Sequence, residues 1–201
     1  MRAIQNYVSR ISVKLQDFNY PIIQKIIYSF AFALLTAYGA QLKFFLPWTP
    51  VPITFQTFFV LLSGLILGSK WGSLSQIIYV SCGALGVPFF SGMESGVSII
   101  FGPRGGYLTG FILTSYIVGY LFEKFEFNFF KSLAILNMAY FVVMYSFGCA
   151  GLGIWLFSIN GAFPSFYSLM AMGVLPFILG DLIKILLVSI VENKFVKKYK
   201  V

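Results

Sequence analysis

Long apolar runs constrain the fold of this chain more than any other feature. About six mostly apolar stretches recur along the 201 residues, near 22–42, 54–69, 71–90, 105–123, 132–157 and 165–191. A helix needs about 20 such residues to cross a hydrocarbon core about 30 Å thick. The runs are continuously apolar and lack the two-residue alternation of a transmembrane barrel. The sequence therefore predicts an all-α integral membrane protein, with six transmembrane helices in one membrane domain over residues 1–201.

The composition excludes several classes of protein. Hydrophobic residues make up 59% of the chain and charged residues 10%, whereas soluble domains carry about 25% charged residues. The chain has no histidine, which excludes histidine-based catalysis and histidine-containing metal sites. It also lacks the G-x-x-x-x-G-K-[ST] phosphate loop, so it does not hydrolyse ATP by that route. We predict that the chain is not an enzyme and holds no metal or cofactor.

The basic residues predict how the chain lies in the membrane. Its net charge of +8 comes from residues between and beyond the apolar runs, which favours membrane topology over nucleic-acid binding. Six crossings place most of them on one side: Arg2, Arg10, Lys14, Lys25, Lys70, Lys124, Lys131, Lys194, Lys197, Lys198 and Lys200. The other side receives Lys43 and Arg104. Because cytoplasmic loops are enriched in Lys and Arg, both termini are expected in the cytoplasm.

Small residues at four-residue spacing mark expected helix contacts, because they let helix backbones approach closely in lipid. The stripes are Ser29, Ala33 and Ala37; Gly64 and Gly68; and Gly102, Gly106 and Gly110. For the glycines we expect packing within the chain. Ala33 and Ala37 have two readings that the sequence leaves open, contact within the chain or docking against another subunit.

Two segments rich in glycine and proline, 46–52 and 87–106, fall on the predicted outer side. Irregular backbone near membrane depth is tolerated only where it is buried in protein or lines a cavity. We interpret these segments as the lid and wall of an outward-facing pocket.

Asp181 and Lys184 are the strongest candidates for a functional site. An ionisable residue well inside an apolar helix is energetically costly and by default marks function. The two residues are three apart, hence on one helical face, where each can partly neutralise the other. They predict a polar anchor for a ligand with donor and acceptor groups, the alternative being a buried pair that only fixes helix packing.

Four further residues are candidates for ligand contacts. Arg104 carries a guanidinium fork that suits a carboxylate or a phosphate, although it also suits a lipid headgroup. Gln56 and Tyr79 are polar positions inside apolar runs, with Gln56 near the outer end. Trp48 can stack on an apolar ligand or belong to an interfacial aromatic belt. Glu94, in the same outer segment as Arg104, can pair with it or gate the entrance.

Three blocks of the sequence resemble the BioY biotin transporter family. Residues 46–57, Leu-Pro-Trp-Thr-Pro-Val-Pro-Ile-Thr-Phe-Gln-Thr, resemble its N-terminal signature. Gly102-Pro-Arg-Gly-Gly-Tyr107 is similar to the family's G-P-T-G-G-Y element, with Arg104 in place of the usual threonine. Residues 176–184 are similar to its closing G-D-x-x-K element. The resemblance runs from about residue 30 to 190.

The resemblance implies a six-helix bundle of the kind found in S components of energy-coupling factor (ECF) transporters. Such a component binds biotin from outside and docks on a transmembrane coupling subunit with two ATPases. In that setting Asp181 would accept from the ureido N–H groups and Lys184 would donate to the ureido carbonyl or hold Asp181 ionised. Arg104 would pair with the carboxylate if it faces the pocket, and Tyr107 belongs to the similar element.

The alternatives left open are an S component for another small vitamin or precursor, operation without a coupling module, and a non-transporting membrane scaffold. By the same resemblance, Ala33 and Ala37 match the face through which S components dock on their coupling subunit.

Overall fold

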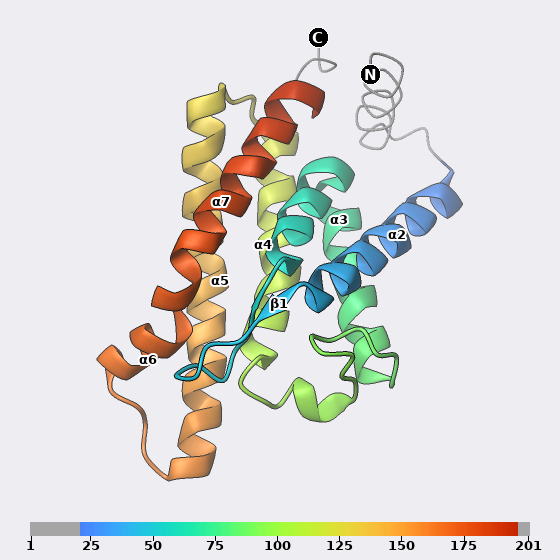
Figure 1. The fold of residues 1–201 in the computed structure, drawn as a ribbon. Helices are drawn as coiled ribbons and strands as arrows, with labels where there is room; N and C mark the ends of the chain where they lie inside the picture. The colour runs from blue at the N-terminus through green and yellow to red at the C-terminus, as the bar shows by residue number, and fades with distance from the viewer. Residues whose placement is uncertain (1–20, 197–201) are drawn as a thin grey trace.

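The computed structural model describes residues 21–196, and helices account for most of them (Figure 1). The elements in chain order are α2 (Ile22–Gln41), β1 (Lys43–Phe44), β2 (Ile53–Thr54), α3 (Gln56–Ala84), the 3-10 turn η1 (Val97–Ile99), α4 (Gly105–Lys124), α5 (Phe129–Asn160), α6 (Phe166–Gly173), α7 (Leu175–Val191) and the π-helical turn η2 (Glu192–Val196).

Helix α3 is a helical hairpin that turns at Gly68. This glycine has a φ of 81°, in the left-handed region that glycine adopts without steric cost. Across the hairpin, Gln76 Nε2 donates to Ser63 Oγ over 3.1 Å. The Glu123 carboxylate accepts hydrogen bonds from Ser69 N and Ser69 Oγ, each over 2.8 Å, and so caps the second arm. The predicted hairpin is confirmed, although its second arm ends at Ala84 rather than at residue 90.

The last apolar run is one bent span rather than one straight helix. Helices α6 and α7 meet at an angle of 43°, and Val174 between them has φ −128° and ψ −61°. Pro176 is the second residue of α7; it lacks the N–H that would bond to Met172 O in a continuous helix, and its ring clashes with that carbonyl, which explains the break. The expected single helix over 165–191 is corrected accordingly.

The chain has the apolar spans of a membrane protein. By length and composition α2, α3, α4 and α5 can each cross a bilayer, and α6 with α7 forms a further, broken span. Because α3 folds back on itself, its two arms run antiparallel, and the described residues form six segments when the bent pair of α6 and α7 is counted as one.

The described part of the chain starts and finishes at one end of the bundle. Ser29 near the start of α2 donates to Trp71 O over 3.0 Å, just beyond the Gly68 turn. At the same end, Ser132 at the start of α5 donates to Glu192 over 3.0 Å. An even number of crossings agrees with this placement. Arg2, Arg10, Lys14, Lys197, Lys198 and Lys200 lie outside the described residues, and which end faces the cytoplasm stays a prediction.

Glycines set the closest helix contacts. A Cβ at Gly64 would lie 2.3 Å from Ser115 O of α4, and one at Gly106 would lie 2.1 Å from Phe147 O of α5. The predicted packing role within the chain is confirmed for Gly64, Gly106 and Gly110, whereas Gly102 lies before α4 and contacts the turn at Ser98 and Ile99.

Ala33 and Ala37 lie inside the bundle. Their exposed fractions are 0% and 8%, and α2 packs mainly against α3. The small-residue stripe of α2 therefore serves contact within the chain, which corrects the reading that these two alanines dock a subunit. The opposite face of α2 carries exposed apolar side chains, among them Phe30, Leu34 and Tyr38.

Candidate functional site

One cavity collects six of the seven predicted ligand-binding residues. It lies between the β1–β2 segment, the segment 85–104 and helices α3, α4, α5 and α7. The predicted residues that line it are Gln56, Tyr79, Arg104, Tyr107, Asp181 and Lys184. The seventh, Trp48, has an exposed fraction of 58% and does not line the cavity. The segments predicted as lid and wall both contribute, through Val51 and Pro52 and through Phe90 and Ser91.

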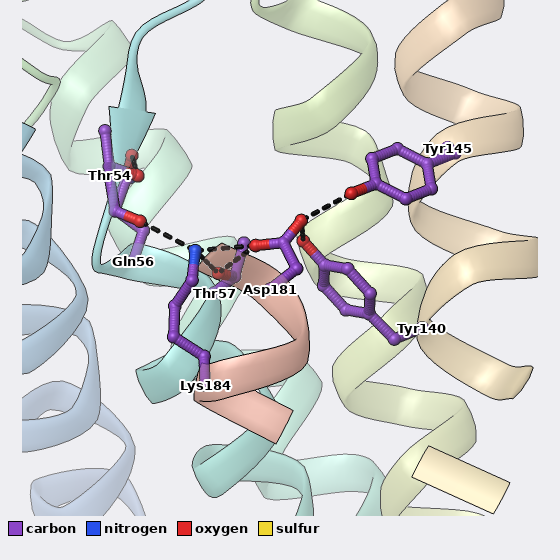
Figure 2. A network of polar contacts seen from close by, with 7 residues as sticks. All are labelled: Thr54, Gln56, Thr57, Tyr140, Tyr145, Asp181 and Lys184. Carbon is purple, nitrogen blue, oxygen red and sulfur yellow. Dashed lines mark hydrogen bonds and ion pairs between the residues drawn. The ribbon is translucent and has the colours of Figure 1, made fainter. Parts of the chain in front are cut away.

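Asp181 and Lys184 form a buried ion pair on the cavity wall (Figure 2). Their separation of three residues on α7 brings Lys184 Nζ to 2.6 Å from Asp181 Oδ1. Their exposed fractions are 3% and 6%. Two charges so far from water persist only when paired and hydrogen-bonded, and the surrounding groups meet that requirement.

Two tyrosines of α5 complete the surroundings of Asp181. Tyr140 Oη and Tyr145 Oη donate to Asp181 Oδ2 over 2.8 and 2.6 Å, and Thr57 Oγ1 lies 3.4 Å from Oδ1. None of these three residues was predicted from the sequence as part of the site. A phenol hydroxyl inside an apolar helix needs a polar partner, and that signal could have marked both tyrosines.

Lys184 joins α7 to the segment that leads into α3. Its Nζ donates to Thr54 O over 2.9 Å and to Thr57 Oγ1 over 2.7 Å. With the Asp181 contact, these bonds use all three donors of the ammonium group. Thr54 O belongs to β2, whose backbone turns into α3 one residue later, so the lysine holds this junction at the cavity.

Gln56 and Tyr79 extend the polar network across the α3 hairpin. Gln56 Nε2 donates to Tyr79 Oη over 2.5 Å, and Thr54 Oγ1 donates to Gln56 Oε1 over 2.9 Å. The Tyr79 ring stacks on Phe89 at 6.3 Å and meets Phe90 edge-on at 5.7 Å. Tyr79 and Phe90 line the cavity and give it an aromatic wall beside its polar one.

Tyr107 positions the break between α6 and α7. Its hydroxyl donates to Gly173 O over 2.6 Å. Its ring packs so closely on α5 that a Cβ at Gly148 would lie 2.3 Å from it. A long-range hydrogen bond thus occupies the carbonyl at the end of α6. This hydrogen bond holds Tyr107, near the start of α4, at the cavity that Asp181 also lines.

Arg104 faces the cavity from the N-terminus of α4. Its Nη1 donates to Ser91 O over 3.2 Å, and its guanidinium forms an ion pair with Glu94. The side chains of Arg104 and Glu94 are 19% and 45% exposed, so this pair is far more hydrated than the one on α7. The pairing of Glu94 with Arg104 that the sequence allowed is present.

The cavity therefore combines three kinds of surface. One wall carries the buried acid and base, another carries aromatic rings, and a guanidinium lies near solvent. Sites with mostly apolar linings and a few placed polar groups bind small molecules and fix their orientation. This lining suits a ligand with a compact polar head, an apolar body and an anionic tail.

Comparison with known proteins gives a consistent family match. The model of the BioY family matches residues 9–201. The biotin transporter BioY of Thermotoga maritima is 35% identical over 171 residues, which cover 83% of this chain and 92% of that protein. The probable biotin transporter BioY of Methanothermobacter thermautotrophicus is 42% identical over 126 residues, covering 62% of this chain and 80% of that protein.

A solved structure has the same fold. The S-component for biotin from an ECF-type ABC transporter aligns with a TM-score of 0.77 and 25% sequence identity. The alignment covers 89% of this chain and 93% of that one. Known proteins that resemble this chain in sequence and in fold are transport components.

Proposed function

Because this chain belongs to the BioY family, we propose that it is a biotin transporter, the S component that captures biotin from the outer side of the membrane and mediates its uptake. The observation that carries this proposal is the buried pair of Asp181 and Lys184 in the same cavity as Arg104. The chain is not an enzyme, and the chemistry asked of the cavity is recognition.

Biotin matches the three surfaces of the cavity. Its ureido ring presents two N–H donors and one carbonyl, which complement the carboxylate of Asp181 and the ammonium of Lys184. Its apolar bicyclic body suits the aromatic wall that includes Tyr79 and Phe90. Its carboxylate tail suits the guanidinium of Arg104.

Binding has to exchange hydrogen bonds at Asp181. A carboxylate accepts at about four positions, and Asp181 already has contacts with Lys184, Thr57, Tyr140 and Tyr145. A ureido N–H group takes the position of one of these donors. The Thr57 contact, at 3.4 Å, is the weakest of the four and the easiest to replace. A second ureido N–H group would replace Tyr140 or Tyr145 in the same way, and the hydroxyl released at that step can donate to the ureido carbonyl.

The energy for uptake comes from other subunits. We propose that an ECF transmembrane coupling subunit with ATPase subunits associates with this chain in a bacterial inner membrane, with both of its termini in the cytoplasm. This is supported by the ECF-type transporter that contains the structural neighbour and by the absence of a nucleotide phosphate loop from the sequence.

Equilibrium binding of labelled biotin to the purified chain in detergent tests the function. Unlabelled biotin, thiamine and riboflavin serve as competitors. We expect saturable, stoichiometric binding displaced by biotin alone, and Asp181→Asn to weaken it at least about tenfold, or 1.4 kcal/mol. Glu126→Gln is the matched control, because Glu126 is an exposed carboxylate outside the cavity. Folded protein that binds no biotin, or is displaced equally by other vitamins, contradicts the proposal.

A further inference from the structure

The guanidinium at the cavity is already occupied by a carboxylate of the chain itself. Arg104 lines the cavity and pairs with Glu94, which does not line it. Glu94 reaches Arg104 from the segment between α3 and α4, and 45% of its side chain is exposed. A ligand anion that approaches Arg104 therefore meets a guanidinium group that is already paired with Glu94.

Ser91 supplies an independent sign that a ligand group belongs next to Arg104. It lines the cavity with an exposed fraction of 3%, and its hydroxyl has no hydrogen-bond partner among residues 21–194. A buried hydroxyl without a partner is destabilising and uncommon. Arg104 Nη1 donates to the carbonyl of the same serine over 3.2 Å, so both polar groups border one part of the cavity.

The backbone around Glu94 is anchored, so only its side chain has to move. Gln41 Nε2 donates to Phe90 O over 3.1 Å, and Gln41 Oε1 accepts from Met93 N over 3.0 Å. Phe90 N donates to Glu94 O over 3.0 Å. The end of α2 thus holds both sides of this short loop.

A second cation, the ammonium group of Lys43, lies near the Glu94 side chain. A Cβ built at Gly92 would meet Lys43 Nζ at 2.5 Å and Glu94 Oε1 at 3.6 Å. Lys43 and Arg104 are positively charged and Glu94 is negatively charged, so the three side chains together have a net positive charge. An incoming carboxylate neutralises that excess, and Glu94 retains a cationic neighbour when it leaves Arg104.

Building on the proposed function, we propose that Glu94 is an internal competitor for the carboxylate of the ligand. On binding, the ligand carboxylate replaces Glu94 on Arg104 and accepts a hydrogen bond from Ser91 Oγ, while Glu94 turns toward Lys43. A ligand with an uncharged tail cannot displace Glu94 from the guanidinium. The exchange therefore makes the cavity selective for ligands that end in an anion.

Affinities for biotin and for biotin methyl ester, which keeps the ureido head and loses the charge, test the exchange. Glu94→Gln removes the competitor, so we expect about two- to fivefold tighter binding of biotin, the range that corresponds to an exposed ion pair. The affinity for the ester stays unchanged. Ser91→Ala weakens the binding of biotin more than that of the ester. Glu94→Ala repeats the first measurement with a side chain that cannot hydrogen-bond.

The Arg104→Gln background separates competition from a general effect of charge. Competition predicts that Glu94→Gln no longer improves biotin binding in that background, whereas a long-range field effect persists. The inference is overturned if Glu94→Gln leaves biotin affinity unchanged or tightens the ester equally. If the wild-type chain binds no biotin, the proposed function is refuted as well. If the wild-type chain binds biotin and Glu94→Gln does not change that affinity, only this inference is refuted.

Discussion

Separating the charges of the buried ion pair should reveal how strongly they depend on each other. Asp181→Asn leaves the Lys184 ammonium buried with two neutral oxygen partners, Thr54 O at 2.9 Å and Thr57 Oγ1 at 2.7 Å. Removal of one partner from a buried pair destabilises a protein by about 3–5 kcal/mol. We expect a loss in that range for Asp181→Asn.

The reverse change should be milder. Lys184→Met leaves a carboxylate that still accepts from Tyr140 and Tyr145 at 2.8 and 2.6 Å, so the loss should lie near the lower limit, about 3 kcal/mol. The double variant contains neither charge, and the amide oxygen of the introduced asparagine can still accept from the tyrosines. Its loss should stay below about 2 kcal/mol, which makes the coupling between the two sites about 4 kcal/mol or more.

Reversible unfolding in mixed micelles, followed by circular dichroism without ligand, measures these free energies. Biotin titration of the same preparations shows whether the double variant is folded and yet unable to bind. If each single variant loses less than about 1 kcal/mol and the losses add in the double variant, the pair is solvated and the reasoning is refuted.

Two further predictions concern the helix contacts that hold the cavity walls. Gly64→Ala places a Cβ 2.3 Å from Ser115 O, so the free energy of unfolding should fall by about 1–3 kcal/mol; Gly153→Ala, whose Cβ meets only Leu169 at 3.6 Å, is the control and should leave it unchanged or higher. Glu123→Ala removes the cap on the second arm of α3 and should lower the free energy of unfolding by about 0.5–2 kcal/mol, with faster amide exchange at the start of that arm; wild-type exchange there would contradict the capping role.

The apolar runs made the helical architecture predictable, because the length needed to cross a bilayer and the hydrophobicity of a span are local properties. The hairpin in α3 was predictable for a similar reason, since two runs with so few residues between them have to fold back. The break at Val174 was not. Proline is tolerated inside transmembrane helices when neighbouring groups satisfy the freed backbone, and here Thr49 Oγ1 donates to Met172 O and the Tyr107 hydroxyl donates to Gly173 O.

The small-residue stripe of α2 predicts a helix contact but does not identify the partner helix. Ala33 and Ala37 indicate a close helix contact, but the spacing is the same whether the neighbouring helix belongs to this chain or to another subunit. Packing against α3 decided the question. Trp48 was uncertain for an equivalent reason, because a tryptophan at the interface and one in a pocket have the same sequence surroundings.

The sequence alone determined that Asp181 and Lys184 share a helical face and that Arg104 lies at the start of a helix, since those relations depend on positions along one element. Only the tertiary structure brought Tyr140, Tyr145 and Thr57 to Asp181 and Glu94 to Arg104. The two tyrosines are five residues apart on α5, a spacing that does not place them on one face, and they converge because the Asp181 side chain reaches between them from α7. Such contacts follow from how helices pack, and helix packing is fixed by glycine contacts, breaks and caps distributed over the whole chain.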